Sequence, residues 1–343
     1  MQTITTRVPA KIILSGEHAV VHGAPAIACA VDLFVQARFR WRSDASYSFE
    51  IAPLEAAHTY SVEQLDAIVA RLDQNYRWFR EGKISIQQVL DHPLEFIPYA
   101  TAIAARHIGS YPPPPCHCEL TIHAPVGCGM GSSAAISIAI IAATGKLLDH
   151  ELPAEEIFDL ALRAESLIHA HPSGVDPAVC LYGGAILFQN RKIQSIPLPT
   201  WEPILLHSGR PLSTTGECVQ AVAEKFPSGH PVWQAFKETV LAIRDRLHIS
   251  PDKHLFQLIR RNHELLCSIG VVPQRIQNVI RAIEEAGGAA KICGAGAVCG
   301  ENAGIIMALG NFNCARIAQR FNLEMLSAHP IAGGLQCYQS SNP

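Results

Sequence analysis

The sequence predicts an α+β fold with two domains. Residues 34–41 alternate between apolar and polar side chains, as a half-buried strand does, whereas residues 61–81 and 93–107 carry apolar side chains at helical spacing. Strand and helix patterns do not alternate regularly, which disfavours a doubly wound parallel sheet. The chain has 343 residues, and at about 150 residues per domain this length predicts two domains.

Elements of both kinds occur on each side of a proline-rich stretch. Three prolines within residues 197–203 mark the expected boundary, which gives an N-terminal domain of residues 1–196 and a C-terminal domain of residues 197–343. The expected strands are 11–14, 26–31, 118–122, 183–188, 204–207, 291–293, 304–309, 323–328 and 334–338. The further expected helices are 133–148, 153–169, 232–247, 254–268, 275–286 and 311–320.

Composition excludes several classes of protein. Hydrophobic residues make up 48% of the chain and charged residues 17%, which is enough apolar material for a large core. The formal net charge is -3 and no basic block occurs, so we expect neither nucleic acid nor a membrane surface as a partner. The longest apolar run, 134–144, is too short to span a bilayer, and the first residues lack a signal-peptide pattern. Eleven cysteines without a CxxC pair indicate reduced thiols, and together these features predict a soluble, cytoplasmic protein.

The strongest local signal is a glycine-rich segment between a strand and a helix. Residues 127–133 read Gly-x-Gly-x-Gly-Ser-Ser, and glycines let a backbone approach a ligand closely. The N–H groups at the start of the following helix favour phosphates, and Ser132 and Ser133 can cap that helix or ligate Mg²⁺. The alternative is a tight turn with an ordinary serine cap. The spacing matches neither a P-loop, nor a dinucleotide fingerprint, nor a serine-hydrolase elbow.

Three charged or titratable side chains near the N-terminus form a second candidate. Lys11 lies in an apolar strand pattern, where an ammonium group needs an anionic partner. Glu17 and His18 follow where that strand ends. The alternative places Lys11 on a solvated strand face and the other two in an ordinary loop.

Two carboxylates further along the chain form a third candidate. Glu165 lies late in its predicted helix, where the helix dipole disfavours a negative charge and a compensating cation is expected. Asp176 is either a general base or metal ligand, or the cap of a helix that begins with Pro177. The hydroxyl cluster 213–215 can likewise be a helix start, and the glycine loop 294–300 can close over a ligand or simply join two strands.

In this order, these segments resemble the GHMP kinase superfamily, and within it the mevalonate kinases. The motifs that carry the resemblance are PAKIILSGEHAVVHGAPAIACAVD (9–32), PVGCGMGSSAA (125–135), HPSGVDPAV (171–179), YGGAILF (182–188) and KICGAGAVCGENAG (291–304). The resemblance extends from residue 9 to about residue 309, and the segment 42–115 matches no motif.

The resemblance implies an N-terminal domain like the second domain of ribosomal protein S5 and a ferredoxin-like C-terminal domain, with the active site between them. It implies phosphorylation of the 5-hydroxyl of mevalonate, a small-molecule substrate, by ATP and Mg²⁺, in an enzyme that can be a homodimer. Asp176 and Lys11 would be catalytic, Glu17, His18 and Thr214 would bind substrate, and Ser133 and Glu165 would hold Mg²⁺. The ATP phosphates would contact Pro125, Gly127, Gly129, Met130, Gly131, Ser132 and Ser133.

Two departures from the family pattern leave alternatives open. Ala297, Val298 and Cys299 stand where the family's third loop is richer in glycine. The segment 207–215 leans towards phosphomevalonate kinases, whose phosphorylated substrate needs an extra cation, and Arg210 and Lys225 are candidates for it. A phosphomevalonate kinase, another GHMP kinase, or a catalytically inactive relative that binds nucleotide are therefore the alternatives to a mevalonate kinase.

Overall fold

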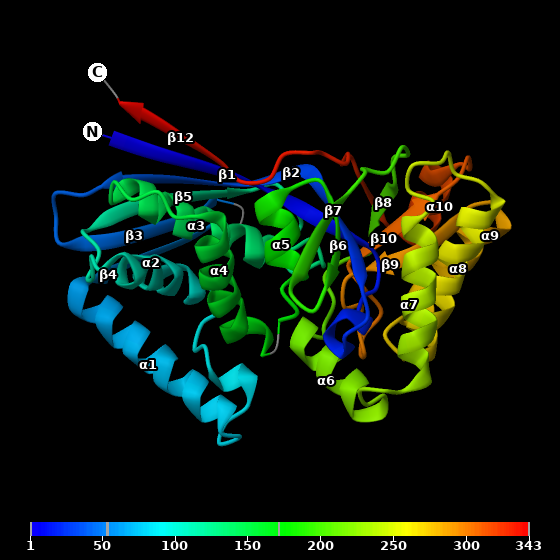
Figure 1. The fold of residues 1–343 in the computed structure, drawn as a ribbon, viewed down its shortest axis with the longest axis horizontal. Helices are drawn as coiled ribbons and strands as arrows, with labels where there is room; N and C mark the ends of the chain where they lie inside the picture. The colour runs from blue at the N-terminus through cyan, green and yellow to red at the C-terminus, as the bar shows by residue number, and fades with distance from the viewer. Residues whose placement is uncertain (1, 53–54, 171, 342–343) are drawn as a thin grey trace.

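The computed structural model describes residues 2–52, 55–170 and 172–341, which form two sheets with helices packed on them (Figure 1). Among these residues, eight strands build a mixed sheet in the order β12-β1-β2-β5-β3-β4, with β6 paired to β2 and β7 paired to β6. Their bounds are β1 Gln2–Ser15, β2 Ala26–Trp41, β3 Ser46–Ile51, β4 Ala56–Ser61, β5 Cys116–Ile122, β6 Ala185–Gln189, β7 Lys192–Ile196 and β12 Gln336–Ser341. The α+β class predicted from the sequence is confirmed.

The two longest strands run antiparallel as neighbours. The expected strands 26–31 and 34–41 are one strand, β2, because the pairing with β1 continues across an irregularity between Pro9 and Ala10. Proline has no N–H to donate, so the ladder shifts register there instead of ending. The first six residues of β2 are all buried and its later residues alternate, so β2 leads from the middle of the molecule to a half-solvated face.

Helices cover one face of this sheet (Figure 1). Their bounds are α1 Val62–Arg80, α2 Phe96–Ile108, α3 Ser132–Leu147, α4 Ala154–His169 and α5 Val175–Tyr182. Helix α3 is buried on nearly every side and packs against β1, β2, α2 and α4, as its composition of small and apolar residues predicts. The helix that carries the candidate phosphate loop is therefore fixed rigidly in the core.

The second sheet has the order β11-β8-β10-β9 and is antiparallel throughout. Its strands are β8 Ile204–His207, β9 Ala289–Cys293, β10 Ile305–Leu309 and β11 Glu324–Leu326. The accompanying helices are α6 Thr215–Lys225, α7 Pro231–Arg244, α8 Lys253–Ser268, α9 Gln274–Glu285 and α10 Cys314–Phe321. Strands β9 and β10 are buried along their whole length. The continuous apolar pattern of β10 predicts this burial, whereas β9 buries Lys291 among its apolar residues.

The chain passes from the first sheet to the second between β7 and β8, at the proline-rich stretch. Its last strand returns to the first sheet, where β12 pairs with β1. One apolar cluster also joins the two sheets, with Ile12 of β1 and Met307 of β10 as members. The division into domains 1–196 and 197–343 stays a prediction. Strand β12 belongs to the second of these ranges but pairs with a strand of the first. None of the helices in the described ranges has the length and apolar composition to cross a membrane.

Candidate active site

The glycine-rich segment connects β5 to α3, and its backbone requires glycine. Gly127, Gly129 and Gly131 have φ angles of +73°, +86° and +71°, a region that side chains disfavour. A Cβ atom on Gly129 would lie 2.6 Å from the carbonyl oxygen of Cys293, so this loop packs directly on the end of β9. The predicted tight turn between a strand and a helix is confirmed, and the approach of this backbone to a ligand stays a prediction.

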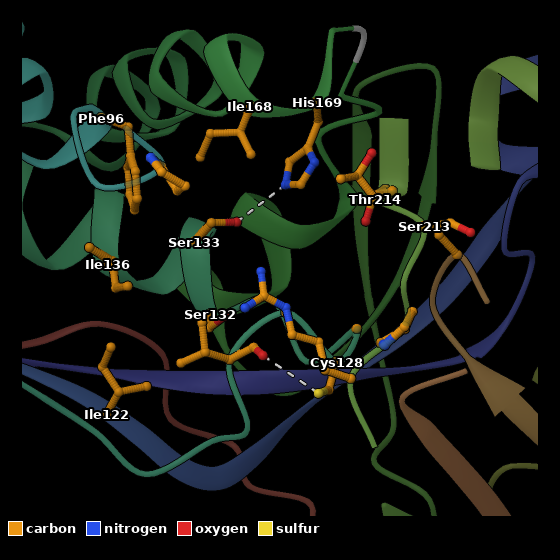
Figure 2. Close-up of a pocket in the computed structure, with 18 of the residues that line it drawn as sticks. Phe96, Ile122, Cys128, Ser132, Ser133, Ile136, Ile168, His169, Ser213 and Thr214 are labelled. Carbon is orange, nitrogen blue, oxygen red and sulfur yellow. Dashed lines mark hydrogen bonds between the residues drawn. The ribbon is translucent and has the colours of Figure 1, made fainter. Parts of the chain in front are cut away.

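The start of α3 corrects one expectation from the sequence. Gly131, in the left-handed conformation, occupies the N-cap position, and no side chain caps the helix. Ser132 and Ser133 are therefore the first helical residues and not caps. Their hydroxyl groups are left for other partners, and the Ser133 Oγ atom points towards His169, 3.4 Å from its Nε2 atom (Figure 2).

Two pockets adjoin at this loop. The larger, of about 490 Å³, is lined by the loop and by apolar side chains that include Phe96, Ile122, Ile136 and Ile168 (Figure 2). The smaller, of about 100 Å³, is lined partly by apolar residues such as Ile13, Val20 and Val219. Its polar and charged lining residues are Lys11, Glu17, His18, Glu165, His169, Ser173, Asp176 and Thr215. Gly129, His169, Thr215 and Ala295 line both pockets, so a ligand in one lies next to a ligand in the other.

Lys11 and Asp176 form an ion pair in the smaller pocket. The Nζ atom of Lys11 lies 2.9 Å from Oδ1 of Asp176, and the two side chains are 2% and 31% exposed. The Lys11 backbone N–H donates to the Met130 carbonyl at 3.0 Å, which ties β1 to the glycine-rich loop. The lysine thus has the anionic partner that its burial requires, and the interpretation of a solvated strand face is wrong.

Asp176 is not the cap of its helix. Gly174 caps α5, and Asp176 lies in the first helical turn with Pro177 after it. A carboxylate in the first turn is stabilised by the positive end of the helix dipole. The side chain keeps partial contact with solvent while it faces Lys11, so it is accessible to a small substrate.

Glu165, Ser133 and His169 meet at the boundary between the pockets. Glu165 is 2% exposed, and burial, reinforced by the negative charge of Asp176, raises its pKa to about 8. Its Oε2 atom lies 3.6 Å from His169 Nε2, and its Oε1 atom is buried with no hydrogen-bond partner among the described residues. A buried carboxylate oxygen without a donor, beside a serine hydroxyl, fits a hard cation such as Mg²⁺.

The Glu17 carboxylate is buried and pairs with the ammonium group of Lys291 on β9. Lys291 also donates to the carbonyl oxygens of Ile13 and Ile292, at 3.2 and 2.7 Å. Burial raises the pKa of Glu17, although the positive charge of Lys291 opposes the rise. Sequence reasoning named no role for Lys291. The signal was the same as at Lys11, a lysine within an apolar strand pattern.

His18 is held as a neutral imidazole. Burial lowers its pKa to about 4, and its Nε2 atom lies 2.9 Å from the Ala295 carbonyl oxygen, to which it donates. The Nδ1 atom is then an acceptor, and it is buried without a partner among the described residues. His18 therefore offers the smaller pocket a hydrogen-bond acceptor.

Comparison with known proteins shows which family the chain belongs to. Residues 97–184, which contain the glycine-rich loop, Glu165 and Asp176, match the family GHMP kinases N terminal domain. The chain is 30% identical to a mevalonate kinase of Pyrococcus horikoshii, with 95% of this chain and 92% of the relative covered. It is 31% identical to a mevalonate kinase of Thermococcus gammatolerans, with the same coverage. The chain belongs to the mevalonate kinase family.

The fold agrees with this membership. The solved structure of the Methanococcus jannaschii mevalonate kinase superposes with a TM-score of 0.76, at 20% sequence identity, and covers 95% of this chain and 98% of that one. The resemblance to GHMP kinases, and to mevalonate kinases within them, is confirmed. Four of the five motif segments contribute residues to the two pockets, whereas the segment 182–188 contributes to neither, and His171 lies outside the described residues.

The predicted nucleotide-binding residues divide into two groups in this mevalonate kinase family member. Gly127, Gly129, Ser132 and Ser133 line the larger pocket, whereas Pro125, Met130 and Gly131 do not. Met130 is buried in the core and contributes its carbonyl group to Lys11. Pro125, Met130 and Gly131 therefore belong to the loop without lining the larger pocket.

Thr214 and the atypical third loop lie at the edge of the larger pocket. Thr214 lines that pocket, not the smaller one, and caps α6 in a reciprocal box with Glu217, so the expected helix start is confirmed. Ala297, Val298 and Cys299 line neither pocket. The hydroxyl oxygen of Ser213 accepts hydrogen bonds from the backbone N–H groups of Val298 and Cys299, both at 3.1 Å. These bonds hold this part of the loop outside the pockets, whereas residues 294–296 of the same loop line them.

Proposed function

We propose that this mevalonate kinase family member transfers the γ-phosphoryl group of ATP to the 5-hydroxyl of mevalonate. The observation that carries the proposal is the Lys11–Asp176 ion pair, which lies in a small pocket directly beside the glycine-rich loop. A carboxylate beside a cation, next to a site for phosphates, is the arrangement that phosphoryl transfer to an alcohol needs.

Each residue then has a defined task. Asp176 accepts the proton of the substrate hydroxyl, and Lys11, which is paired with that carboxylate, faces the charge that develops on the transferred group. The backbone of residues 127–131 and the N-terminus of α3 hold the phosphates. Ser133 and Glu165 would hold Mg²⁺, which neutralises charge on the phosphates when bound. Glu17 and His18 provide polar contacts for the acceptor.

The smaller pocket favours an unphosphorylated acceptor. Its volume is about 100 Å³, and Lys11, already paired with Asp176, is the only lysine or arginine among its described lining residues. Lys225 lines neither pocket, and Arg210 lines the larger one. A phosphorylated acceptor would bring about two further negative charges into a pocket with no free cation. Phosphomevalonate is therefore the poorer candidate.

The test is ADP release from Mg·ATP in the presence of mevalonate, phosphomevalonate, galactose, homoserine or no acceptor. We expect turnover with mevalonate alone, and loss of turnover in Asp176→Asn without loss of folding. Turnover with another acceptor would keep the kinase chemistry and reject the substrate. ATP binding without turnover on any acceptor would reject the proposal in favour of an inactive, nucleotide-binding relative. The Mg²⁺ requirement, a cytoplasmic location and a homodimer stay predictions.

A further inference from the structure

Cys128 lies in the middle of the phosphate loop and takes part in a contact that the kinase reaction does not use. Its side chain lines the larger pocket, and the residue is 3% exposed. The Sγ atom lies 3.2 Å from Nε2 of His207, the last residue of β8, and 3.5 Å from the Val126 carbonyl oxygen. The nearest polar neighbour of the thiol is thus an imidazole from the other sheet.

The imidazole is oriented by a carboxylate. The Nδ1 atom of His207 lies 3.2 Å from Oε2 of Glu324, and β11 pairs with β8 so that these two residues are directly opposite each other. A carboxylate oxygen accepts a hydrogen bond, so Nδ1 carries the proton and the lone pair of Nε2 faces the thiol. The thiol of Cys128, the imidazole of His207 and the carboxylate of Glu324 therefore form a chain of hydrogen bonds. They correspond to the nucleophile, the base and the group that orients the base in base-activated nucleophiles.

A second thiol in the same pocket lacks this base. Cys293 also lines the larger pocket and is 1% exposed. Burial raises the pKa of both thiols to about 11, so each stays protonated at neutral pH. Among the described residues, no histidine nitrogen is hydrogen-bonded to Cys293. The two cysteines line the same pocket, and only Cys128 has a neighbouring imidazole, although their charged neighbours also differ, Arg210 for Cys128 and Lys291 for Cys293. Cys293 is therefore an internal control for the effect of replacing His207.

We propose that Cys128 is a thiol-modification site at which a small-molecule disulfide entering the nucleotide pocket exchanges with the thiol, with His207 as proton acceptor. The Cys128 proton moves to Nε2 of His207 as the sulfur attacks one sulfur of the disulfide. The disulfide bond of the reagent breaks, a new bond joins Cys128 to half of the reagent, and the other half leaves as a thiol with the proton from His207. Glu324 stabilises the imidazolium formed on the way.

The consequence for the enzyme rests on the proposed function. A group on Cys128 would occupy the space over Gly127 and Gly129, where the backbone meets the nucleotide phosphates. The modified protein would not bind ATP, and a reductant would restore binding. The phosphate loop would thus respond to the thiol–disulfide balance around it.

The experiment treats the full-length protein with bis(2-hydroxyethyl) disulfide and follows the adduct on each cysteine by peptide mass spectrometry. We expect Cys128 to react at least about tenfold faster than Cys293, and His207→Gln to slow Cys128 alone by about 100-fold, the usual contribution of a general base. Glu324→Gln, which changes an exposed side chain and leaves the fold intact, should slow Cys128 as well. The rate at Cys293 should not change in either variant.

Equal rates at Cys128 and Cys293, or a Cys128 rate that neither variant changes, would overturn the proposal. Saturating Mg·ATP provides a separate arm, because it should protect Cys128 by filling the pocket. Modification that depends on His207 but not on ATP would leave the thiol site standing and count against the assignment of the pocket to nucleotide. Dithiothreitol should reverse the adduct and restore ATP binding.

Discussion

The ammonium group of Lys11 and the carboxylate of Asp176 lie 2.9 Å apart, although 165 residues separate them in the chain. Lys11 is fixed because its own backbone N–H bonds to the glycine-rich loop, whereas Asp176 is fixed by the first turn of α5. The pair therefore links the strand, the glycine-rich loop and the helix, each of which contributes to the smaller pocket.

Replacing the lysine tests this pair. We expect Lys11→Met to lower kcat by about 100- to 1,000-fold, the typical cost of removing one group that stabilises developing charge. ATP binding, measured by calorimetry, should persist, because the loop backbone and α3 remain. Asp176 is partly exposed, so water can take the place of its partner and the protein should fold. Lys192→Met, which removes an exposed lysine of β7, is the control and should keep full kcat. Full activity of Lys11→Met would reject the assigned role.

Glu165 should make the metal-free protein less stable as pH rises. Its pKa is about 8 in the folded state, against an ordinary value of 4.5, so the folded state binds the proton more tightly than the unfolded state does. The stabilisation is complete below pH 4.5 and is lost progressively up to about pH 8. We expect the free energy of unfolding, measured with urea in the presence of a chelator, to fall across this window.

The control for this pH dependence is chosen from the same helix. Glu165→Gln should remove its share of the slope, because an amide does not titrate. Glu155→Gln, which changes an exposed carboxylate in the first turn of α4, should leave the slope as it is. If the two variants have identical slopes, Glu165 does not titrate as inferred.

Local patterns were sufficient to predict the framework of the site. The glycine-rich loop, α3 and α4 depend on contacts between residues close in sequence, and their apolar periodicity and glycine spacing predicted them. The caps predicted for α3 and α5 were wrong, because Gly131 and Gly174 take the cap positions in left-handed conformations. Serine and aspartate are common N-cap residues, so their presence beside these glycines favoured the wrong prediction.

Contacts between distant strands could not be predicted from the residues alone. Glu17 and Lys291 pair across 274 residues only because β1 and β9 approach each other. The same holds for the return of β12 to β1 and for the contact of Cys128 with His207. Each joins segments that lie far apart in the sequence, and the pattern of one segment does not show which distant segment it will pair with or pack against.

Adding one methyl group at Gly131 should separate Lys11 from Asp176. A Cβ atom there would lie 2.9 Å from Cγ and 3.0 Å from Cε of Lys11, and the φ of +71° adds strain. We expect Gly131→Ala to lower the free energy of unfolding by about 1–2 kcal/mol and to lower kcat as Lys11 moves. Gly216→Ala is the matched control. It lies in α6 with its nearest neighbour 4.0 Å away, and it should stabilise the protein by about 0.5–1 kcal/mol at unchanged kcat.

Replacing Thr214 tests whether this residue only caps α6 or also contributes to substrate binding. Its hydroxyl accepts a hydrogen bond from the Glu217 N–H at 3.2 Å, so Thr214→Ala should lower the free energy of unfolding by about 1 kcal/mol. Loss of the cap also loosens the first turn of α6, where Thr215 lines both pockets, so we expect the KM for mevalonate to rise. Thr214→Ser keeps the hydroxyl and should restore both quantities. A lower stability with an unchanged KM would make Thr214 a cap alone and remove it from the substrate site.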